Sequence, residues 1–130
     1  MRVYIAAPKA ELARAKSVAS QLRERGIEVT SRWHEVLAEG AKDPTDREER
    51  GTVLRHNLAD LGRATVMLAL TSDGAGRETY VEIGRAIECG IPVVWSIERG
   101  GEALSSSSAF VAATDADAIA CLALVASGAP

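Results

Sequence analysis

The chain has 130 residues, 47% of them hydrophobic, and a formal net charge of −3 from 15 basic and 18 acidic residues. This length suits a single globular domain over residues 1–130 that can bury a core. The interspersed charges give no basic footprint and no polybasic patch, so we expect neither a nucleic-acid polymer nor a membrane as partner.

The sequence also carries no feature of a secreted or membrane protein. No apolar stretch is long enough to span a membrane, and the first residues lack the pattern of a signal peptide. Cys89 and Cys121 are far apart and lack metal-ligand spacing, which indicates free thiols in a reducing compartment and no metal site. We therefore expect a cytoplasmic protein.

Segments typical of strands and helices alternate along the chain. Gly26 ends the first helical pattern, and Cys89 with Gly90 ends the helix that contains Glu82. Residues 31–45 are polar and irregular. The predicted strands cover residues 2–7, 27–30, 64–70, 91–96 and 109–112, and the predicted helices cover residues 10–25, 46–62, the segment around Glu82 and residues 115–126, with Thr45 and Glu48 forming a capping box and residues 98–108 a Gly- and Ser-rich loop.

This alternation predicts an α/β fold, a single-domain doubly wound Rossmann-like parallel sheet of five strands in the order 2-1-3-4-5, with helices on both faces. The turn Ala6-Ala7-Pro8-Lys9 lacks the glycines of a dinucleotide fingerprint. The sequence has no P-loop, no Gly-x-Ser-x-Gly elbow and no Cys/His cluster. These absences exclude nicotinamide dehydrogenases, nucleoside triphosphatases, hydrolases of the elbow type and zinc enzymes.

Glu82 is the most informative residue of the sequence. It lies near the start of a helix that follows a buried strand and the Gly-rich turn over residues 71–76. In open α/β sheets this arrangement borders the crevice where ligands bind, at the carboxyl ends of the strands. The alternative is an acid that is favoured near a helix N-terminus by the helix dipole alone.

Four segments converge on this edge and together resemble the nucleoside 2-deoxyribosyltransferase family, which includes related nucleoside 5′-monophosphate N-glycosidases. The likeness covers most of the first hundred residues and consists of V-Y-I-A-A-P at residues 3–8, V-T-S-R-W at 29–33, N-L-A-D-L at 57–61 followed by A-T-V at 64–66, and V-E-I-G-R-A at 81–86. It implies cleavage of the N-glycosidic bond of a (deoxy)nucleoside and transfer of the deoxyribosyl group to another base. It implies no metal or organic cofactor.

The resemblance assigns catalytic roles to Glu82 and Tyr4. Glu82 corresponds to the nucleophile that attacks C1′, and an anion beneath the anomeric carbon suits an oxocarbenium-like transition state. Tyr4 corresponds to the tyrosine that orients the nucleophile by a hydrogen bond. An ordinary strand tyrosine packed under a helix remains the alternative for Tyr4.

The sequence departs from the family at two positions. Asn57 stands where the family has an aspartate, and an amide cannot donate a proton as an acid, so Asp60, one turn later on the same face, is the candidate substitute. Gly76 stands six residues before Glu82, where the family has an aspartate or a serine. Asp73 on the same loop is the candidate acid for the leaving base, or a turn-forming residue before a glycine.

The remaining candidates contact substrate rather than perform chemistry. Trp33 stacks on a nucleobase or lies in the core or a subunit interface. Arg32 binds a 5′-phosphate through its planar fork or is solvated, and His34 is expected on a surface loop. The candidate substrate-binding residues are Ala6, Arg32, Trp33, Asn57, Gly76, Ser96 and Ser105, the last in a serine run that binds phosphate or serves as a linker.

Three functions follow from these residues. The first is deoxyribosyl transfer between bases, and the second is hydrolysis of a nucleoside 5′-monophosphate by the same machinery. The third, from another class, is a catalytically silent nucleotide-binding or sensing module, which Asn57 and Gly76 favour and which Glu82 and Tyr4 oppose. The expected partners are a nucleoside or nucleoside monophosphate, a free nucleobase and further copies of the chain, because a short chain favours a homodimer or higher homo-oligomer with a shared site.

Overall fold

The protein forms one five-stranded parallel sheet in the order β2-β1-β3-β4-β5, as the sequence predicts. The structure is a computed structural model that describes residues 1–38, 46–73, 76–101 and 108–128. The strands are β1 (Arg2–Ala6), β2 (Glu28–Val29), β3 (Val66–Ser72), β4 (Val93–Arg99) and β5 (Phe110–Ala112). The helices are the 3-10 turn η1 (Lys9–Glu11), α1 (Leu12–Glu24), α2 (Trp33–Ala38), α3 (Arg47–Gly62), α4 (Arg77–Glu88) and α5 (Asp115–Ala126).

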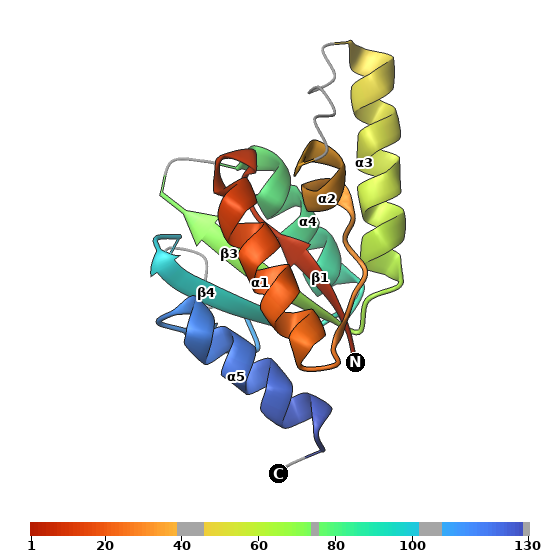
Figure 1. Ribbon diagram of the computed structural model, residues 1–130. Helices are drawn as coiled ribbons and strands as arrows, with labels where there is room; N and C mark the ends of the chain where they lie inside the picture. The colour runs from red at the N-terminus through yellow and green to blue at the C-terminus, as the bar shows by residue number, and fades with distance from the viewer. Residues whose placement is uncertain (39–45, 74–75, 102–107, 129–130) are drawn as a thin grey trace.

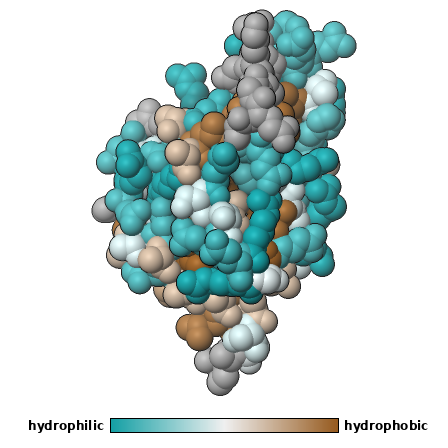
Figure 2. Space-filling view, in the orientation of Figure 1, coloured by the Kyte–Doolittle hydropathy of each residue, from teal (hydrophilic) through white to brown (hydrophobic). Residues whose placement is uncertain are grey.

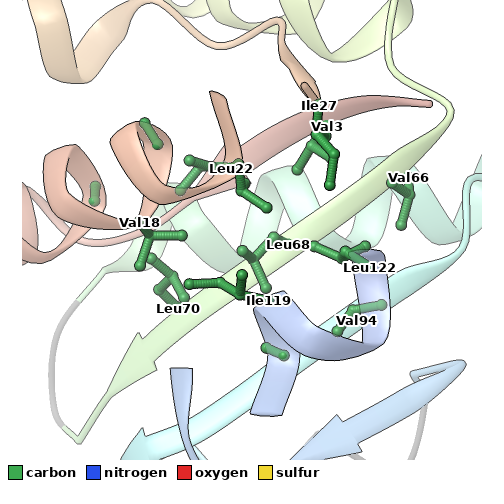
Figure 3. Packing of buried hydrophobic residues seen from close by; sticks show 14 of the residues in the cluster. Val3, Val18, Leu22, Ile27, Val66, Leu68, Leu70, Val94, Ile119 and Leu122 are labelled. Atoms are coloured by element: carbon green, nitrogen blue, oxygen red, sulfur yellow. The ribbon is translucent and has the colours of Figure 1, made fainter. Parts of the chain in front are cut away.

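Helices cover both faces of the sheet, and strand side chains alternate between the two cores. On one face, Figure 3 shows Leu22 of α1 and Ile119 of α5 pointing toward Leu68 of β3. On the other face, α3 and α4 pack over Tyr4 and Trp95. Each fully buried large apolar side chain contributes about 1.5–3 kcal/mol, so these two layers fix the helices against the sheet.

The topological switch lies between β1 and β3, which pair in parallel from Val3 opposite Val66 to Ala6 opposite Ala69. The chain winds from β1 to β2 on one side and from β3 to β4 and β5 on the other. The loops that follow β1 and β3 therefore diverge to opposite faces and leave a crevice at their carboxyl ends. Figure 1 shows α2 and α4 near the end of β1, with α3 alongside α2.

The start of α3 corrects the predicted capping box. Thr45, the predicted cap, lies outside the described residues, and Asp46 is the N-cap. The Asp46 side chain accepts a hydrogen bond of 2.8 Å from the Glu49 amide, which satisfies one of the free N–H groups of the first turn. In the sequence, the pattern Asp46-x-x-Glu49 lies one residue after Thr45-x-x-Glu48, and both patterns fit the capping-box rule equally well.

The prediction that residues 31–45 are irregular is wrong for the described part, because α2 forms over Trp33–Ala38. A helix this short has little intrinsic stability, so tertiary contacts hold it. The Trp33 indole N–H donates to the Ile5 carbonyl at 2.8 Å, and His34 Nε2 lies 3.0 Å from the Ser31 hydroxyl. His34 is fully buried rather than on a surface loop.

The first half of α3 extends beyond the body of the molecule (Figure 1). Val53 and Leu54 on this part of α3 are 40% and 37% exposed, and Val36 of α2 is 51% exposed. Figure 2 shows hydrophobic atoms beside α3 on a surface that is otherwise largely hydrophilic. Within the described ranges, no helix is both long and apolar enough to cross a membrane.

Candidate active site

A cavity of about 890 Å³ lies at the carboxyl edge of β1, between α2, α3 and α4. The segment after β1 supplies one wall through Ala7 and Pro8, and α4 supplies another through Thr79 and Glu82. The remaining sides are closed by Arg32, which directly precedes α2, and by apolar and polar side chains of α2 and α3. The lining residues of these two helices are Trp33, Val36, Leu37, Arg50, Gly51, Val53, Leu54, His56, Asn57 and Asp60.

Glu82 faces this cavity from the second turn of α4 and is only 6% exposed. Ile83 and Ala86 of the same helix pack into the core, which fixes the rotation of α4 and directs Glu82 toward the cavity. Burial raises the pKa of the Glu82 carboxyl to about 7, a contact with Tyr4 lowers it, and the charge of Glu78 raises it further. A carboxylate with so little water around it is unusual for a helix surface and is typical of a functional site.

Tyr4 lies on β1 beneath Glu82 and is fully buried. Burial raises the pKa of its hydroxyl, and the charges of Glu82 and Asp60 raise it as well, so the phenol stays protonated. Although its contact with Glu82 lowers the pKa of the carboxyl, the hydroxyl has no hydrogen-bond partner of standard geometry among the described residues. The site thus places a buried hydroxyl donor, without a hydrogen-bond acceptor of its own, beside the Glu82 carboxylate.

Asp60 lines the cavity from α3, and two arginines hold its carboxylate. Arg32 Nη2 donates to Oδ1 at 2.7 Å and its Nε lies 3.1 Å from both carboxylate oxygens, while Arg63 Nη2 donates to Oδ1 at 2.9 Å. The Asp60 side chain is 2% exposed and the Arg32 side chain is 59% exposed. The paired guanidinium groups compensate the buried charge, and Asp60 in turn anchors Arg32 at the cavity wall.

Trp33 joins the cavity to the core. It lines the cavity, packs against both hydrophobic clusters and meets the His34 ring edge-on at 5.4 Å between centroids. Because its indole N–H is bound to the Ile5 carbonyl, its ring cannot rotate away without losing a hydrogen bond. Of the positions that the sequence left open for Trp33, which are the crevice, the core and a subunit interface, the structure combines the first two in one side chain.

Asn57 and Gly76, the two positions that depart from the family pattern, both line the cavity. Gly76 is the N-cap of α4 with a φ of 90°, a left-handed conformation that favours glycine. A Cβ at this position would lie 2.8 Å from Pro8 Cγ and 2.8 Å from Thr79 Oγ1. The left-handed backbone and the neighbouring side chains of Pro8 and Thr79 therefore disfavour the aspartate or serine that the resemblance leads one to expect here.

Among the described residues, four predicted site residues lie outside the cavity lining: Tyr4, which lies beneath Glu82, and Ala6, Asp73 and Ser96. Ala6 is buried within the sheet, and the next residue, Ala7, lines the cavity instead. Asp73 Oδ1 accepts a hydrogen bond from the Gly101 amide at 3.1 Å and lies outside the lining. Ser96 is described in the next paragraph.

Ser96 points to the opposite face of the sheet from the cavity. It is fully buried, donates to Asp115 Oδ1 at 2.6 Å and accepts from Arg14 Nη2 at 3.4 Å. Its neighbour Trp95 packs on the cavity side of the sheet, and successive strand residues point to opposite faces. Ser105 lies outside the described residues.

Several residues of the lining were missed by sequence reasoning. Glu78 lies four residues before Glu82, and this helical spacing was a signal that places both acids on one face of α4. Lys9, Arg50 and His56 also line the cavity, but nothing in their local sequence marks them. Across the described ranges, no group of three or more His, Cys, Asp and Glu side chains could hold a metal ion.

Comparisons with known proteins identify similar folds but no similar sequence. No protein-family model matches the chain, and no curated protein matches it significantly. The 2-deoxyribosyltransferase of Bacillus psychrosaccharolyticus has a similar structure, with a TM-score of 0.74 and 20% identity over 90% of this chain and 89% of that one. The CMP N-glycosidase BcmB of Clostridium botulinum has a TM-score of 0.62 and 18% identity over 96% of this chain and 99% of that one. The fold is therefore the one that the motif resemblance predicted.

Proposed function

We propose that this protein cleaves the N-glycosidic bond of a nucleoside or nucleotide, with Glu82 as the nucleophile, and transfers the deoxyribosyl group to another base. The observation that carries the proposal is a buried carboxylate, Glu82, that faces a cavity at the sheet edge with a buried tyrosine hydroxyl beneath it. The similarity of the fold to a 2-deoxyribosyltransferase supports this assignment.

The electrostatics of Glu82 suit this chemistry. Burial raises the pKa of its carboxyl, so the protein alone stabilises its negative charge poorly. When positive charge develops on the sugar ring, the carboxylate gains a partner at short range in a site with little water. The attraction is therefore greater in the oxocarbenium-like transition state than in the ground state, and this difference is what lowers the barrier.

Tyr4 and the cavity walls complete the proposed site. In the proposed reaction, the buried Tyr4 hydroxyl donates to one oxygen of Glu82 as substrate binds and leaves the other oxygen to attack C1′. The Trp33 ring and the apolar side chains Leu37 and Leu54 bound the space for the base, while the Asn57 amide supplies a polar contact. Thr79 lies on the same face of α4 as Glu82, where its hydroxyl can bind the sugar.

A second candidate is hydrolysis of a nucleoside 5′-monophosphate. The observation that favours it is the group of basic side chains Lys9, Arg32, Arg50 and His56 in the lining, together with the similar fold of a CMP N-glycosidase. A guanidinium fork binds a phosphate in a bidentate manner, and Asp60 holds the Arg32 fork in place. The glycosyl-enzyme is common to both candidates, and only the acceptor differs.

The first experiment is a chromatographic assay of the purified protein with deoxynucleosides and with deoxynucleoside monophosphates, each with and without a free acceptor base. Exchange products that require the acceptor indicate transfer, and free base from monophosphates alone indicates hydrolysis. The absence of any product, with ligand binding retained, supports the silent binding module instead.

Glu82→Ala is the variant that tests the nucleophile. We expect it to reduce turnover by at least about 10³-fold, because a covalent route loses its attacking atom. Glu88→Ala on the same helix is the control, since Glu88 is exposed and lies outside the cavity lining. Turnover that survives in Glu82→Ala rejects the assignment.

The proposal retains a site shared between subunits, as expected from the short chain. The measurement is light scattering of the active protein at assay concentration. A strictly monomeric protein with full activity contradicts this part of the proposal without affecting the role of Glu82.

A further inference from the structure

Three carboxylates line the cavity within the described part of the chain, and each has a different environment: Asp60, Glu78 and Glu82. Both oxygens of Asp60 accept hydrogen bonds from Arg32. Glu82 is buried against Tyr4. Glu78 is exposed and lines the cavity, and no hydrogen bond or ion pair joins its side chain to another described residue.

Glycosyl transfer through Glu82 also needs a group that handles a proton. A neutral nucleobase leaves as an anion unless a proton reaches one of its nitrogens, and an acceptor base or water must lose a proton as it attacks. Retaining glycosidases meet this need with a second carboxyl about 5–5.5 Å from the nucleophile. Residues four apart on a helix have Cβ atoms about 5–6 Å apart, and Glu78 precedes Glu82 by this interval on α4.

We infer that Glu78 is the general acid and base of the reaction, a catalytic residue that donates a proton to the leaving base and removes one from the acceptor. This inference rests on the proposed function of Glu82. The other groups are less suited: Asn57 carries no acidic proton, and Asp73 lies outside the lining with one oxygen bound to the Gly101 amide. Tyr4 is fully buried and lies outside the cavity lining.

With Glu82 as nucleophile and Glu78 as acid and base, protons and electrons balance in both steps of the reaction. In the first step, a Glu82 oxygen forms a bond to C1′, the C1′–N bond breaks with its electron pair going to the base nitrogen, and the Glu78 proton passes to the base. In the second step, the acceptor base or water gives a proton to the Glu78 carboxylate and forms a bond to C1′. The C1′–O bond breaks as this new bond forms, and its electron pair returns to Glu82.

The two carboxyls also interact electrostatically, because the charge of Glu78 raises the pKa of Glu82. This interaction is consistent with two acidic side chains that lie on the same face of α4 and line the same cavity.

The test compares Glu78→Gln with the unaltered protein on two substrates. One is an unmodified purine deoxynucleoside, and the other is its N7-methylated form, whose base is already cationic and leaves as a neutral molecule. We expect Glu78→Gln to reduce kcat/KM about 10²-fold or more on the unmodified substrate and less than about threefold on the methylated one. Glu88→Gln serves as the matched control, with no change on either substrate.

Three outcomes overturn the inference, and they are distinguishable from failure of the proposed function. An equal loss on both substrates indicates a structural role for Glu78, and no loss on either indicates no role. Full retention of activity by Glu78→Asp and Glu78→Gln alike has the same meaning. If Glu82→Ala retains activity, or the unaltered protein cleaves neither substrate, the proposed function fails and the inference fails with it.

Discussion

At the scale of single residues, the site contrasts two buried carboxylates that are stabilised in opposite ways. Asp60 is 1% exposed, and two arginines compensate its charge. Glu82 is 6% exposed and has no cationic partner among the described residues, so the folded protein disfavours its ionised form. Asp60 thus has the paired environment of a structural carboxylate, whereas the unpaired environment of Glu82 fits the reactive role that we propose for it.

Glu82 should therefore reduce stability at high pH. The pKa of Glu82 is about 7 in the folded protein against an ordinary value of 4.5, so between these values the folded state binds more protons than the unfolded state. Stability attributable to this group falls as pH rises through that window, by the order of 1–3 kcal/mol in total. Glu82→Gln should be more stable than the unaltered protein at pH 8 by urea denaturation, with the difference vanishing near pH 4. A difference that grows toward low pH contradicts this sign.

We expect a glycine to be required at position 76, because its left-handed backbone conformation is strained for other residues. Gly76→Ala places a Cβ 2.8 Å from Pro8 Cγ at a φ of 90°, so we expect a loss of about 1–3 kcal/mol and reduced activity, because the first turn of α4 must move. Gly84→Ala is the control on the same helix. A Cβ at Gly84 meets nothing within 4 Å, and helix propensity predicts a gain of about 0.5–1 kcal/mol. Thermal unfolding of both variants separates backbone strain from the general effect of replacing a glycine.

At the scale of secondary-structure elements, α3 is stabilised by a local sequence signal at its start and by tertiary contacts at its end. The start of α3 has a local signal, the Asp46 cap, and its last turn is anchored by the buried residue Leu61. The first half of α3, residues 47–54, contains no buried side chain and extends beyond the sheet. Even so, Arg50, Val53 and Leu54 of this half line the cavity. The cap therefore stabilises one wall of the site.

Loss of the Asp46 cap should affect substrate binding more than chemistry. Asp46→Ala removes the hydrogen bond to the Glu49 amide, at a cost of about 1 kcal/mol, and frays the first turn of α3. We expect KM to rise several-fold with kcat nearly unchanged. Thr114→Ala is the matched control, because Thr114 caps α5 through the Asp117 amide at 3.0 Å and lies outside the cavity. An equal rise of KM in both variants means that stability alone is responsible.

At the scale of the whole molecule, a buried polar network joins α1, β4 and α5 on the face opposite the cavity. Arg14 donates to Asp115 through Nε and Nη2 at 2.7 Å each and to the Thr71 carbonyl at 3.0 Å. The Ser96 hydroxyl completes the network through Asp115. Burial raises the pKa of the Asp115 carboxyl, but the bonds from Arg14 and Ser96 outweigh it and hold the pKa below the ordinary value.

Removing Arg14 should destabilise the whole domain. Arg14→Met leaves Asp115 without its partner in a site where the two side chains are 9% and 14% exposed, so we expect a loss of about 3 kcal/mol at neutral pH. The double variant Arg14→Met with Asp115→Leu should recover much of this loss, because no unpaired charge remains. Chemical denaturation of both single variants and the double variant measures the coupling, and strict additivity contradicts it.

The sequence by itself determined the order and type of the main elements and the topology of the sheet. Periods of two and of 3.6 residues, together with glycine stops, are local properties, and the right-handed crossover rule leaves few topologies for such an alternation. The same local information placed Glu82 near a helix start after a Gly-rich turn. It also placed Tyr4 on the neighbouring strand, where the structure finds it beneath Glu82.

The tertiary structure alone decided which polar residues share a site. Ser96 and Asp73 follow the same strand-end logic as Glu82, yet the pleat directs Ser96 to α5, and the Gly101 amide holds Asp73 away from the cavity. Asp60 became an anchor because Arg32 and Arg63, distant or unmarked in sequence, converge on it. These outcomes depend on the face of each element and the partner that packs there, which residue type and spacing do not encode. Burial, which raised the pKa of Glu82, likewise exists only once the helices close over the sheet.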